Sequence, residues 1–482
     1  MIKIRLSAVV MAASLLWPAV TSAAENSAQP QPLLLDEVLA SSARYFPQIL
    51  ESLAGRRAAE GSALEAEGAF DLVFSADGNQ NTGYYDSTAL KGGARQRLRT
   101  IGGSVYSDYK LSNGNFPVYQ DNSFTNTGGS FRVGMLFSLL RDRSIDPQRF
   151  GVIDARLNVQ EASLDVLLTR IGVQERALVA YWDWVAKGRQ LGVYEELLQI
   201  AIERQDGLEG EVERGARAEI FLTENQQNIT RRQILVTSAQ RDLALATNLL
   251  SLYYRDQSGR PAAVSPDRLP PGSSIEEVFQ ESTPPVVPVS EALTRRPELA
   301  ILRTAIEREQ NRISLAENQL KPRLDFFVEA QQGLGAVAEG GASRDGTNAM
   351  AGFTFSIPLQ QRAGRGRLQR AQANLDARQQ QQRLREDQID LEIRNLLVDL
   401  NISRDLLMLA DQEVQQSEIM RDSEQRRFDS GASDFFLLNI REETAANARI
   451  RLLEAELQAR IARANYDAAT VDVERLGIDE PE

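Results

Sequence analysis

The chain has 482 residues, more than one ordinary domain needs, and a formal net charge of −13 at pH 7. An acidic chain is a poor partner for nucleic acid, because phosphate binding requires a basic face. The sequence contains no cysteine and no histidine, which excludes disulfide bridges, thiol nucleophiles, Cys/His zinc sites and Ser-His-Asp triads. We therefore expect no cofactor, no metal site and no nucleic-acid partner.

The first 24 residues have the pattern of a secretory signal peptide. Lys3 and Arg5 provide a positive start, residues 6–20 are mostly apolar, and residues 22–24 are small enough for a cleavage site. The apolar stretch is shorter than the roughly 20 residues that a membrane-spanning helix needs. We therefore interpret residues 1–24 as a signal for export.

The rest of the chain repeats itself. Three pairs of segments correspond in the same order: 44–49 with 294–299, 134–139 with 352–357, and 214–222 with 430–438. The offset falls from 250 for the first pair to 218 and 216 for the others. The first copy therefore carries about 32 extra residues, between its first helix and its second strand.

This duplication predicts the organisation of the chain. After the signal peptide, each repeat contains a helix, two strands and a long helical hairpin. A proline-rich linker separates the repeats and holds eight of the 17 prolines, so we expect it to be irregular or extended. The predicted parts are a first repeat at 25–255, the linker at 256–297, a second repeat at 298–476 and a tail at 477–482.

Apolar side chains alternate with polar ones in the predicted strands. A soluble sheet packed on a core and a membrane barrel with one face in lipid both fit this alternation. The residues expected on the apolar, lipid-facing side are Phe70, Leu72, Phe74, Phe131, Val133, Phe326, Val328, Phe353 and Phe355. Residues 78–104 and 332–350 are predicted as loops, and residues 103–109 fit either an extra hairpin arm or part of a loop within the extra segment around 85–125.

Two proline-free segments, 150–212 and 362–428, predict very long helices. About 63 residues make a rod on the order of 95 Å long, which must pack sideways against other helices. Apolar residues recur every seven positions in the segments that follow, from Leu222 to Leu250 and from Leu438 to Val473, which indicates coiled-coil packing. Gly215 and Gly431 interrupt the helices, so each repeat forms a helical hairpin with its tip at the glycine.

These features together resemble the TolC family of outer-membrane export channels. The resemblance extends over about residues 33–476 and includes the segments 296–299, 355–359 and 427–432. It implies an α+β membrane protein that forms a homotrimer. Each chain would give four strands to a 12-stranded β-barrel in the bacterial outer membrane, and the helices would form an α-helical barrel in the periplasm, where most of the chain lies.

The resemblance also implies a function. The chain would be the outer-membrane channel of a tripartite efflux or type I secretion system, and it would conduct substrate passively to the exterior. Its partners would be outer-membrane lipid, an inner-membrane pump and a periplasmic adaptor (membrane fusion) protein. The adaptor would contact the hairpin tips, which carries over to Gly215, Ala216, Gly431 and Ala432 of this chain.

The chain departs from the family where acidic residues close the periplasmic end of the channel, because Leu437 and Ile440 stand at the matching positions. We expect Asp434 and Glu219 to line this constriction together with Leu437, since a ring of carboxylates attracts cations. An apolar gate built from Phe435, Phe436 and Leu437 is the alternative.

Two other function classes remain to be weighed. A periplasmic coiled-coil structural or adaptor protein without a channel would use a soluble sheet and would need no detergent. A hydrolase would need a carboxylate pair, such as Asp71 with Asp77 or Asp142 with Asp146, but strand and loop polarity explains those residues. Motifs for phosphate binding and for nucleophilic serine are absent from the sequence, so we do not expect an enzyme.

Overall fold

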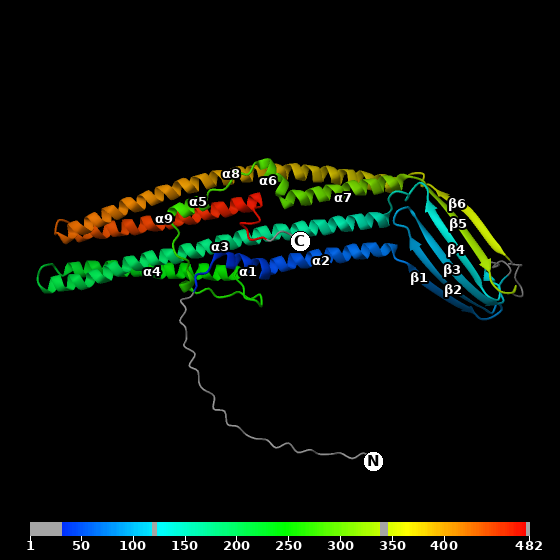
Figure 1. Ribbon diagram of the computed structural model, residues 1–482, viewed down its shortest axis with the longest axis horizontal. Coiled ribbons are helices and arrows are strands. Elements are labelled where there is room, and N and C mark those ends of the chain that lie inside the picture. Colours follow the sequence, from blue (N-terminus) through cyan, green and yellow to red (C-terminus); the bar gives the residue numbers. More distant parts are fainter. Residues whose placement is uncertain (1–30, 118–122, 338–345, 479–482) are drawn as a thin grey trace, which may run out of the picture.

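The computed structural model describes residues 31–117, 123–337 and 346–478. The chain is a long rod with a β-sheet at one end and helices along the remainder (Figure 1). This mixture of long helices and one antiparallel sheet confirms the α+β architecture expected from the sequence. The signal peptide predicted at 1–24 lies outside the described residues.

One antiparallel sheet contains all the strands of the described residues, in the order β1-β2-β3-β4-β5-β6. They are β1 (Val73–Asn81), β2 (Ser87–Arg97), β3 (Gly103–Gly114), β4 (Ser130–Ser138), β5 (Arg323–Gly333) and β6 (Thr347–Ser356). The pairing of β4 with β5 joins the two halves of the chain, and β1 and β6 are the edges of the sheet.

The sheet has six strands where the sequence predicts four. The additional pair, β2 and β3, occupies residues that the first copy has and the second lacks, and all of β2 lies in the segment 78–104 predicted as a loop. The prediction fails there because β2 carries two glycines and several charged residues, so its period-two pattern is weak. Residues 103–109 are thus the arm of an extra hairpin.

Each half of the chain contributes a kinked helix pair and a long hairpin. The first half provides α1 (Leu35–Tyr45), α2 (Pro47–Glu67), the short η1 (Gly68–Phe70), α3 (Pro147–Glu213) and α4 (Ile220–Tyr253). The second provides α6 (Val289–Arg295), α7 (Pro297–Leu320), α8 (Arg362–Asp429) and α9 (Phe435–Thr470). Pro47 and Pro297 hold the residues before them in extended conformations, which separates α1 from α2 and α6 from α7.

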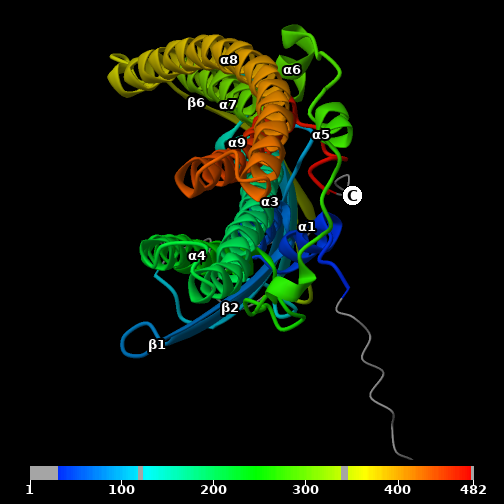
Figure 2. The same cartoon turned by 90° about the vertical axis from the view of Figure 1, so that its left-hand side faces the viewer.

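The helices lie side by side in a curved layer (Figure 2). Toward the tips the order across the layer is α8, α9, α3, α4, and toward the sheet it is α8, α7, α3, α2. One lateral edge is therefore α8, which follows β6 in the chain. The other edge consists of α4 and α2, and α2 leads into β1, so each edge of the helical layer continues into an edge of the sheet.

The predicted heptad seams are buried along most of their length. Val236, Leu243 and Leu250 of α4 are at most 5 % exposed, and Leu438 and Ala445 of α9 are at most 1 % exposed. None of the described helices is long and apolar enough to cross a bilayer. These long helices thus pack sideways against one another, as the sequence predicts.

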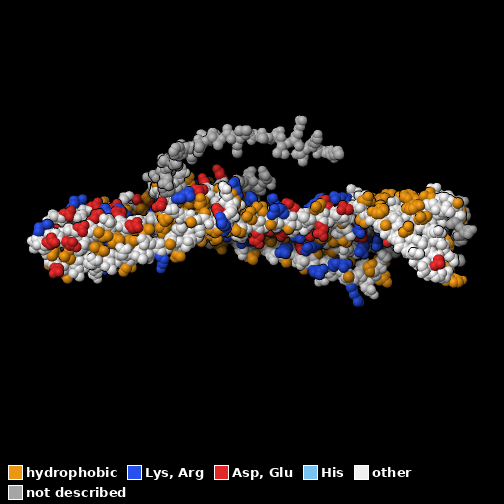
Figure 3. Space-filling model, turned by 90° about the horizontal axis from the view of Figure 1, so that it is seen from below, with side chains coloured by type: hydrophobic (Ala, Val, Ile, Leu, Met, Phe, Trp, Pro, Cys, Tyr) orange, Lys and Arg blue, Asp and Glu red, His pale blue; other side chains and the backbone are white. Residues whose placement is uncertain are grey.

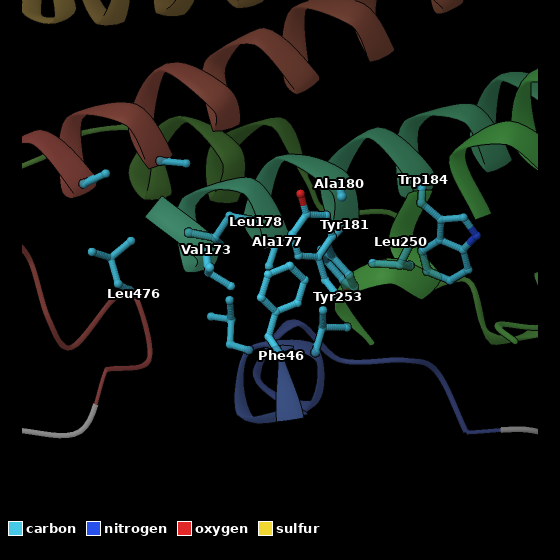
Figure 4. Close-up of a cluster of buried hydrophobic side chains, with 14 of the residues drawn as sticks. Phe46, Val173, Ala177, Leu178, Ala180, Tyr181, Trp184, Leu250, Tyr253 and Leu476 are labelled. Carbon is cyan, nitrogen blue, oxygen red and sulfur yellow. The ribbon is translucent and has the colours of Figure 1, made fainter. Parts of the chain in front are cut away.

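The largest buried cluster lies where α1, α4 and the C-terminal segment pack on the middle of α3 (Figure 4). Trp184 and Leu250 are fully buried in it, and the ring of Phe46 stacks on Tyr253 with centroids 5.4 Å apart. This cluster holds the kink between α1 and α2 against the long hairpin.

The segment predicted as an irregular linker, 256–297, contains two short helices besides the 3₁₀ turn η3 (Pro266–Arg268). The prediction is wrong for α5 (Ile275–Glu281), which Ser274 and Glu277 cap reciprocally at its start, and for α6. α6 lies 250 residues after part of α1 and precedes a proline in the same way, so it is the counterpart of α1 in the second copy.

Truncation of Leu250 tests the importance of the buried cluster. Leu250→Ala removes side-chain atoms from a fully buried site, so we expect it to lower the free energy of unfolding by about 3 kcal/mol. Leu359→Ala makes the same chemical change at a residue that is 88 % exposed, and it should cost less than about 0.5 kcal/mol. Thermal and denaturant unfolding in detergent, followed by circular dichroism, measures both, and equal effects would contradict this assignment.

Candidate functional site

The two hairpin tips are built in the same way. Gly215 and Gly431 follow the ends of α3 and α8 with φ of +71° and +75°, a left-handed conformation that glycine adopts without strain. Backbone hydrogen bonds of 2.8–3.0 Å close both turns: Gly215 N–H to Val212 O, Ala216 N–H to Glu211 O, Gly431 N–H to Phe428 O and Ala432 N–H to Arg427 O. The sequence motif therefore encodes one turn twice.

The residues expected to contact an adaptor are all exposed at these turns. Gly215 and Ala216 belong to the turn between α3 and α4, and Gly431 and Ala432 to the turn between α8 and α9. Both turns lie at the end of the rod farthest from the sheet (Figure 1). A Cβ atom placed at either glycine would meet no atom within 4 Å. The tips therefore present bare backbone to the surroundings.

The predicted constriction residues lie at the starts of the return helices. Asp434 caps α9, and its Oδ1 accepts a hydrogen bond of 2.7 Å from the N–H of Leu437. Glu219 occupies the corresponding position before α4 but makes no capping hydrogen bond with its side chain. Both carboxylates are exposed, whereas Leu437 is half-buried. A ring around a channel needs other copies of the chain, so the role of these residues stays a prediction.

An aromatic cluster, which the sequence analysis missed, joins the two tips. Phe221 of α4 and Phe428 of α8 both pack on Phe435 of α9, with ring centroids 6.4 and 6.3 Å apart. The guanidinium of Arg217 lies over the rings of Phe221 and Phe428, at 5.6 and 4.7 Å from their centroids. The only signal in the sequence was the position of these rings within six residues of the glycines.

Because Phe435 belongs to this cluster, its place in the alternative apolar gate is wrong. Its side chain is 2 % exposed and holds the hairpins together, while the next residue, Phe436, is 71 % exposed. An apolar gate in this chain would rest on Phe436 and Leu437.

Buried charges join the two hairpins next to the aromatic cluster, on its side toward the sheet. Arg232 of α4 donates from Nη2 to Oε2 of Glu442 in α9 at 2.8 Å, and their side chains are 1 % and 3 % exposed. Arg204 of α3 pairs with the same carboxylate, and Asn439 accepts hydrogen bonds from both arginines. The carbonyl of Leu197 accepts a further bond of 2.6 Å from Arg232. One carboxylate thus ties together three helices.

A second charge cluster joins α3 to α9 farther from the tips. Arg189 Nη1 lies 3.2 Å from Glu456 Oε2, and the guanidinium of Arg460 lies 3.6 Å from the centroid of the Trp182 ring. Burial raises the pKa of Glu456 and lowers the pKa of Arg460. Both clusters lie where α3 meets α9, so buried polar contacts hold the two hairpins in register.

The strands put the predicted lipid-facing residues that they contain on one face of the sheet, and Leu72 lies one residue before β1. The register places Phe326 opposite Phe353 and Phe137, and Val133 opposite Ala330. Exposed apolar side chains gather over this end of the molecule (Figure 3). The exposed fractions of the predicted residues are: Leu72 65 %, Phe74 74 %, Phe131 46 %, Val133 42 %, Phe326 37 %, Val328 42 %, Phe353 75 % and Phe355 57 %.

Phe70 is the exception among the residues predicted to face lipid. It lies in η1, before the sheet begins, and its side chain is 6 % exposed. The guanidinium of Arg99 lies 5.6 Å from its ring centroid. The prediction fails because Phe70 lies three residues before the first residue of β1, where the period-two alternation of a strand does not apply.

The opposite face of the sheet is polar and carries a network of charges. Arg132 of β4 lies 2.9 Å from Asp108 of β3 and 3.6 Å from Glu329 of β5. Lys91 of β2 approaches Asp108 to 4.0 Å, and the hydroxyl of Tyr106 donates to Glu329 at 2.9 Å. The sheet therefore separates an apolar face from a polar, ion-paired one.

Part of the sequence matches a known protein family. Residues 289–470, from the first residue of α6 to the last residue of α9, match the family model of the outer membrane efflux proteins. No curated protein matches the sequence significantly.

Solved structures resemble about nine tenths of the chain. The open state of the MtrE outer membrane channel of Neisseria gonorrhoeae matches with a TM-score of 0.64 and 14 % identity, covering 90 % of this chain and 88 % of that one. The CmeC outer membrane channel of Campylobacter jejuni has a TM-score of 0.61 and 12 % identity, covering 92 % and 90 %. The outer membrane protein VceC of Vibrio cholerae has a TM-score of 0.61 and 16 % identity, covering 90 % of this chain and 95 % of that one. At these identities, the similarity establishes the fold.

Substitution of Glu442 tests the buried charge cluster. Glu442→Ala leaves Arg204 and Arg232 without their carboxylate in a buried site, so we expect a loss of about 3–5 kcal/mol in the free energy of unfolding.

The neighbouring Glu443 provides a matched control. It pairs with Arg231 at the surface, where the two side chains are 32 % and 57 % exposed, so Glu443→Ala should cost less than about 1 kcal/mol. Chemical denaturation of both variants measures the difference, and a Glu442→Ala variant as stable as Glu443→Ala would contradict the role of the cluster.

Proposed function

We propose that this chain, which resembles the TolC family of export channels in fold and in the sequence of its second half, is the outer-membrane channel of a three-part exporter. In this role it conducts substrate passively from a pump in the inner membrane, through a periplasmic adaptor, to the exterior. The observation that carries the proposal is the six-stranded sheet with one exposed apolar face, one polar face and two unpaired edges at the end of a long helical rod.

The apolar face supports a location in lipid. A soluble protein rarely exposes a contiguous apolar patch of this kind, because contact with water is unfavourable. Strands that point apolar side chains outward and charged ones inward are typical of barrels in the outer membrane. The ion-paired face then lines a water-filled interior, and the apolar face meets the bilayer.

The edges of the sheet support assembly from copies of this chain. In the described residues β1 and β6 have no partner strand on their outer sides, and a bilayer offers no hydrogen bonds to such edges. Because the number of strands is even, β6 of one copy runs antiparallel to β1 of the next. A ring of copies therefore satisfies both edges by a single repeated contact.

The helical layer has matching lateral edges. On α8 exposed apolar side chains recur along the helix at Leu384, Leu391 and Val398, each about 60 % exposed. On α4, at the opposite edge, Ile234 and Leu245 are 65 % and 59 % exposed. We infer that α8 of one copy packs beside α4 and α2 of the next, in the same ring that closes the sheet. Three copies are the number that the family resemblance implies.

The hairpin tips are the surface for the adaptor. They are the part of the rod most distant from the sheet, so in the assembled channel they face the inner membrane. Exposed glycine backbone at Gly215 and Gly431 allows a close approach that bulky side chains would prevent.

A periplasmic coiled-coil protein without a channel is the competing assignment. It is disfavoured because its sheet would expose Phe74, Phe353 and Phe355 to water. Cell fractionation separates the two proposals. We expect the protein in the outer-membrane fraction, released only by detergent. Recovery from the periplasm in soluble form, without detergent, would refute the channel.

Conduction is the direct test of function. Detergent-purified protein in a planar lipid bilayer should give discrete, long-lived conductance steps that prefer cations, because carboxylates line the narrow end. A detergent-dependent protein that gives no steps with its tips intact, and none after removal of the tip residues, would contradict the proposal.

Asp434→Asn tests which residues form the constriction. Asparagine caps a helix as well as aspartate does, so this variant removes the charge and keeps the start of α9. We expect the cation preference to fall severalfold. Asp405→Asn makes the same change on the surface of α8, far from the tip, and should leave the preference unchanged. Equal selectivity of Asp434→Asn and the unmodified protein would assign the gate to Phe436 and Leu437.

A further inference from the structure

Among the residues that the structure describes, the β2–β3 hairpin has no counterpart in the second half of the chain. The second half gives the sheet a single pair of strands, β5 and β6, whereas the first half gives it β1, β2, β3 and β4. The two additional strands span Ser87–Gly114 and account for the extra residues of the first copy. They are inserted between β1 and β4, which would themselves pair in antiparallel fashion without them.

The outer face of the hairpin continues the apolar face of the sheet. The register puts Leu90 of β2 opposite Leu111 of β3, and their side chains are 56 % and 37 % exposed. Tyr109 of β3 lies opposite Phe131 of β4 and is 41 % exposed. The hairpin therefore presents the same kind of surface to lipid as the strands on either side of it.

The inner face of the hairpin takes part in the polar network of the sheet. Asp108 of β3 connects Lys91 of β2 with Arg132 of β4, which in turn reaches Glu329 of β5. The guanidiniums of Arg95 and Arg132 both lie over the ring of Tyr106, at 5.6 and 5.8 Å from its centroid. An external loop would not form ion pairs that connect four neighbouring strands, so the hairpin is a continuous part of the sheet.

From these observations we propose that β2 and β3 are wall strands of the barrel and widen it. The inference rests on the proposed assembly of three copies, whose six strands each make eighteen in place of twelve. With strands about 4.8 Å apart and tilted by about 40°, the backbone diameter is roughly 36 Å for eighteen strands and roughly 24 Å for twelve. The exit then admits solutes too bulky for a twelve-stranded barrel, and ion pairs line it.

Spin-label distances between copies measure this diameter without any need for the channel to be open. The chain has no cysteine, so Ala330→Cys places one label per copy, on the outer face of β5. In a ring of three copies, the backbone distance between equivalent positions is about 31 Å for an eighteen-stranded barrel and about 21 Å for a twelve-stranded one. The linkers of the spin labels add the same length to both distances. We expect the longer distance in the otherwise unmodified chain.

A deletion isolates the contribution of the hairpin. Removal of residues 85–126 joins the end of β1 to the start of β4 through a short loop, and the Ala330→Cys distance should then fall by about 10 Å. A label at Ser238→Cys, on the exposed side of α4, is the matched control, and its distance should be the same with and without the hairpin.

The outcomes separate this inference from the proposed function. A distance near 21 Å in the full chain, or one that the deletion leaves unchanged, would overturn the wide barrel while the ring of copies stands. The absence of any distance between copies, from both label positions in the full chain, would overturn the ring and the inference with it. If the deletion variant fails to assemble, the distance in the full chain decides alone.

Discussion

Unpaired backbone groups at the edges of the sheet are the constraint on which the remaining structure depends. A six-stranded sheet whose outer strands lack partners is tolerated in water only with protection, and in a bilayer it is not tolerated at all. In the proposed channel, β1 and β6 must therefore find partner strands, and another copy of the chain offers both. The even number of strands makes the repeated contact antiparallel, which keeps the pattern of the whole sheet.

The helical layer is organised around the same requirement. Its edge helix α8 follows directly from β6, and the helix at the other edge, α2, leads directly into β1. A ring that closes the sheet therefore brings α8 beside the next copy's α2 and α4 along the whole rod. The proposed ring gives the exposed apolar residues on these helices a place to pack, so sheet and helices support the same proposed assembly.

Within one chain, the two hairpins are joined by polar contacts as well as by apolar packing. Glu442 binds two arginines from the other hairpin in a buried site, and the ring of Phe435 fills the space between the tips. Buried ion pairs are costly to desolvate and strongly dependent on geometry. They therefore favour one relative position of the two hairpins. A seam of alanine and leucine alone would also permit positions shifted along the helix axis.

The amino-acid sequence by itself determined the duplication, the long heptad helices, the glycine turns and the apolar side of most strands. Each of these follows from local periodicity or from the conformational range of one residue, as at Gly215 and Gly431. The tertiary structure decided what depends on contacts between distant segments: that β2 joins the sheet despite its glycines, that Phe70 is buried, and that Phe435 and Glu442 hold the hairpins together. Cross-strand pairing and buried charge compensation come from residues far apart in the chain, so no local pattern records them.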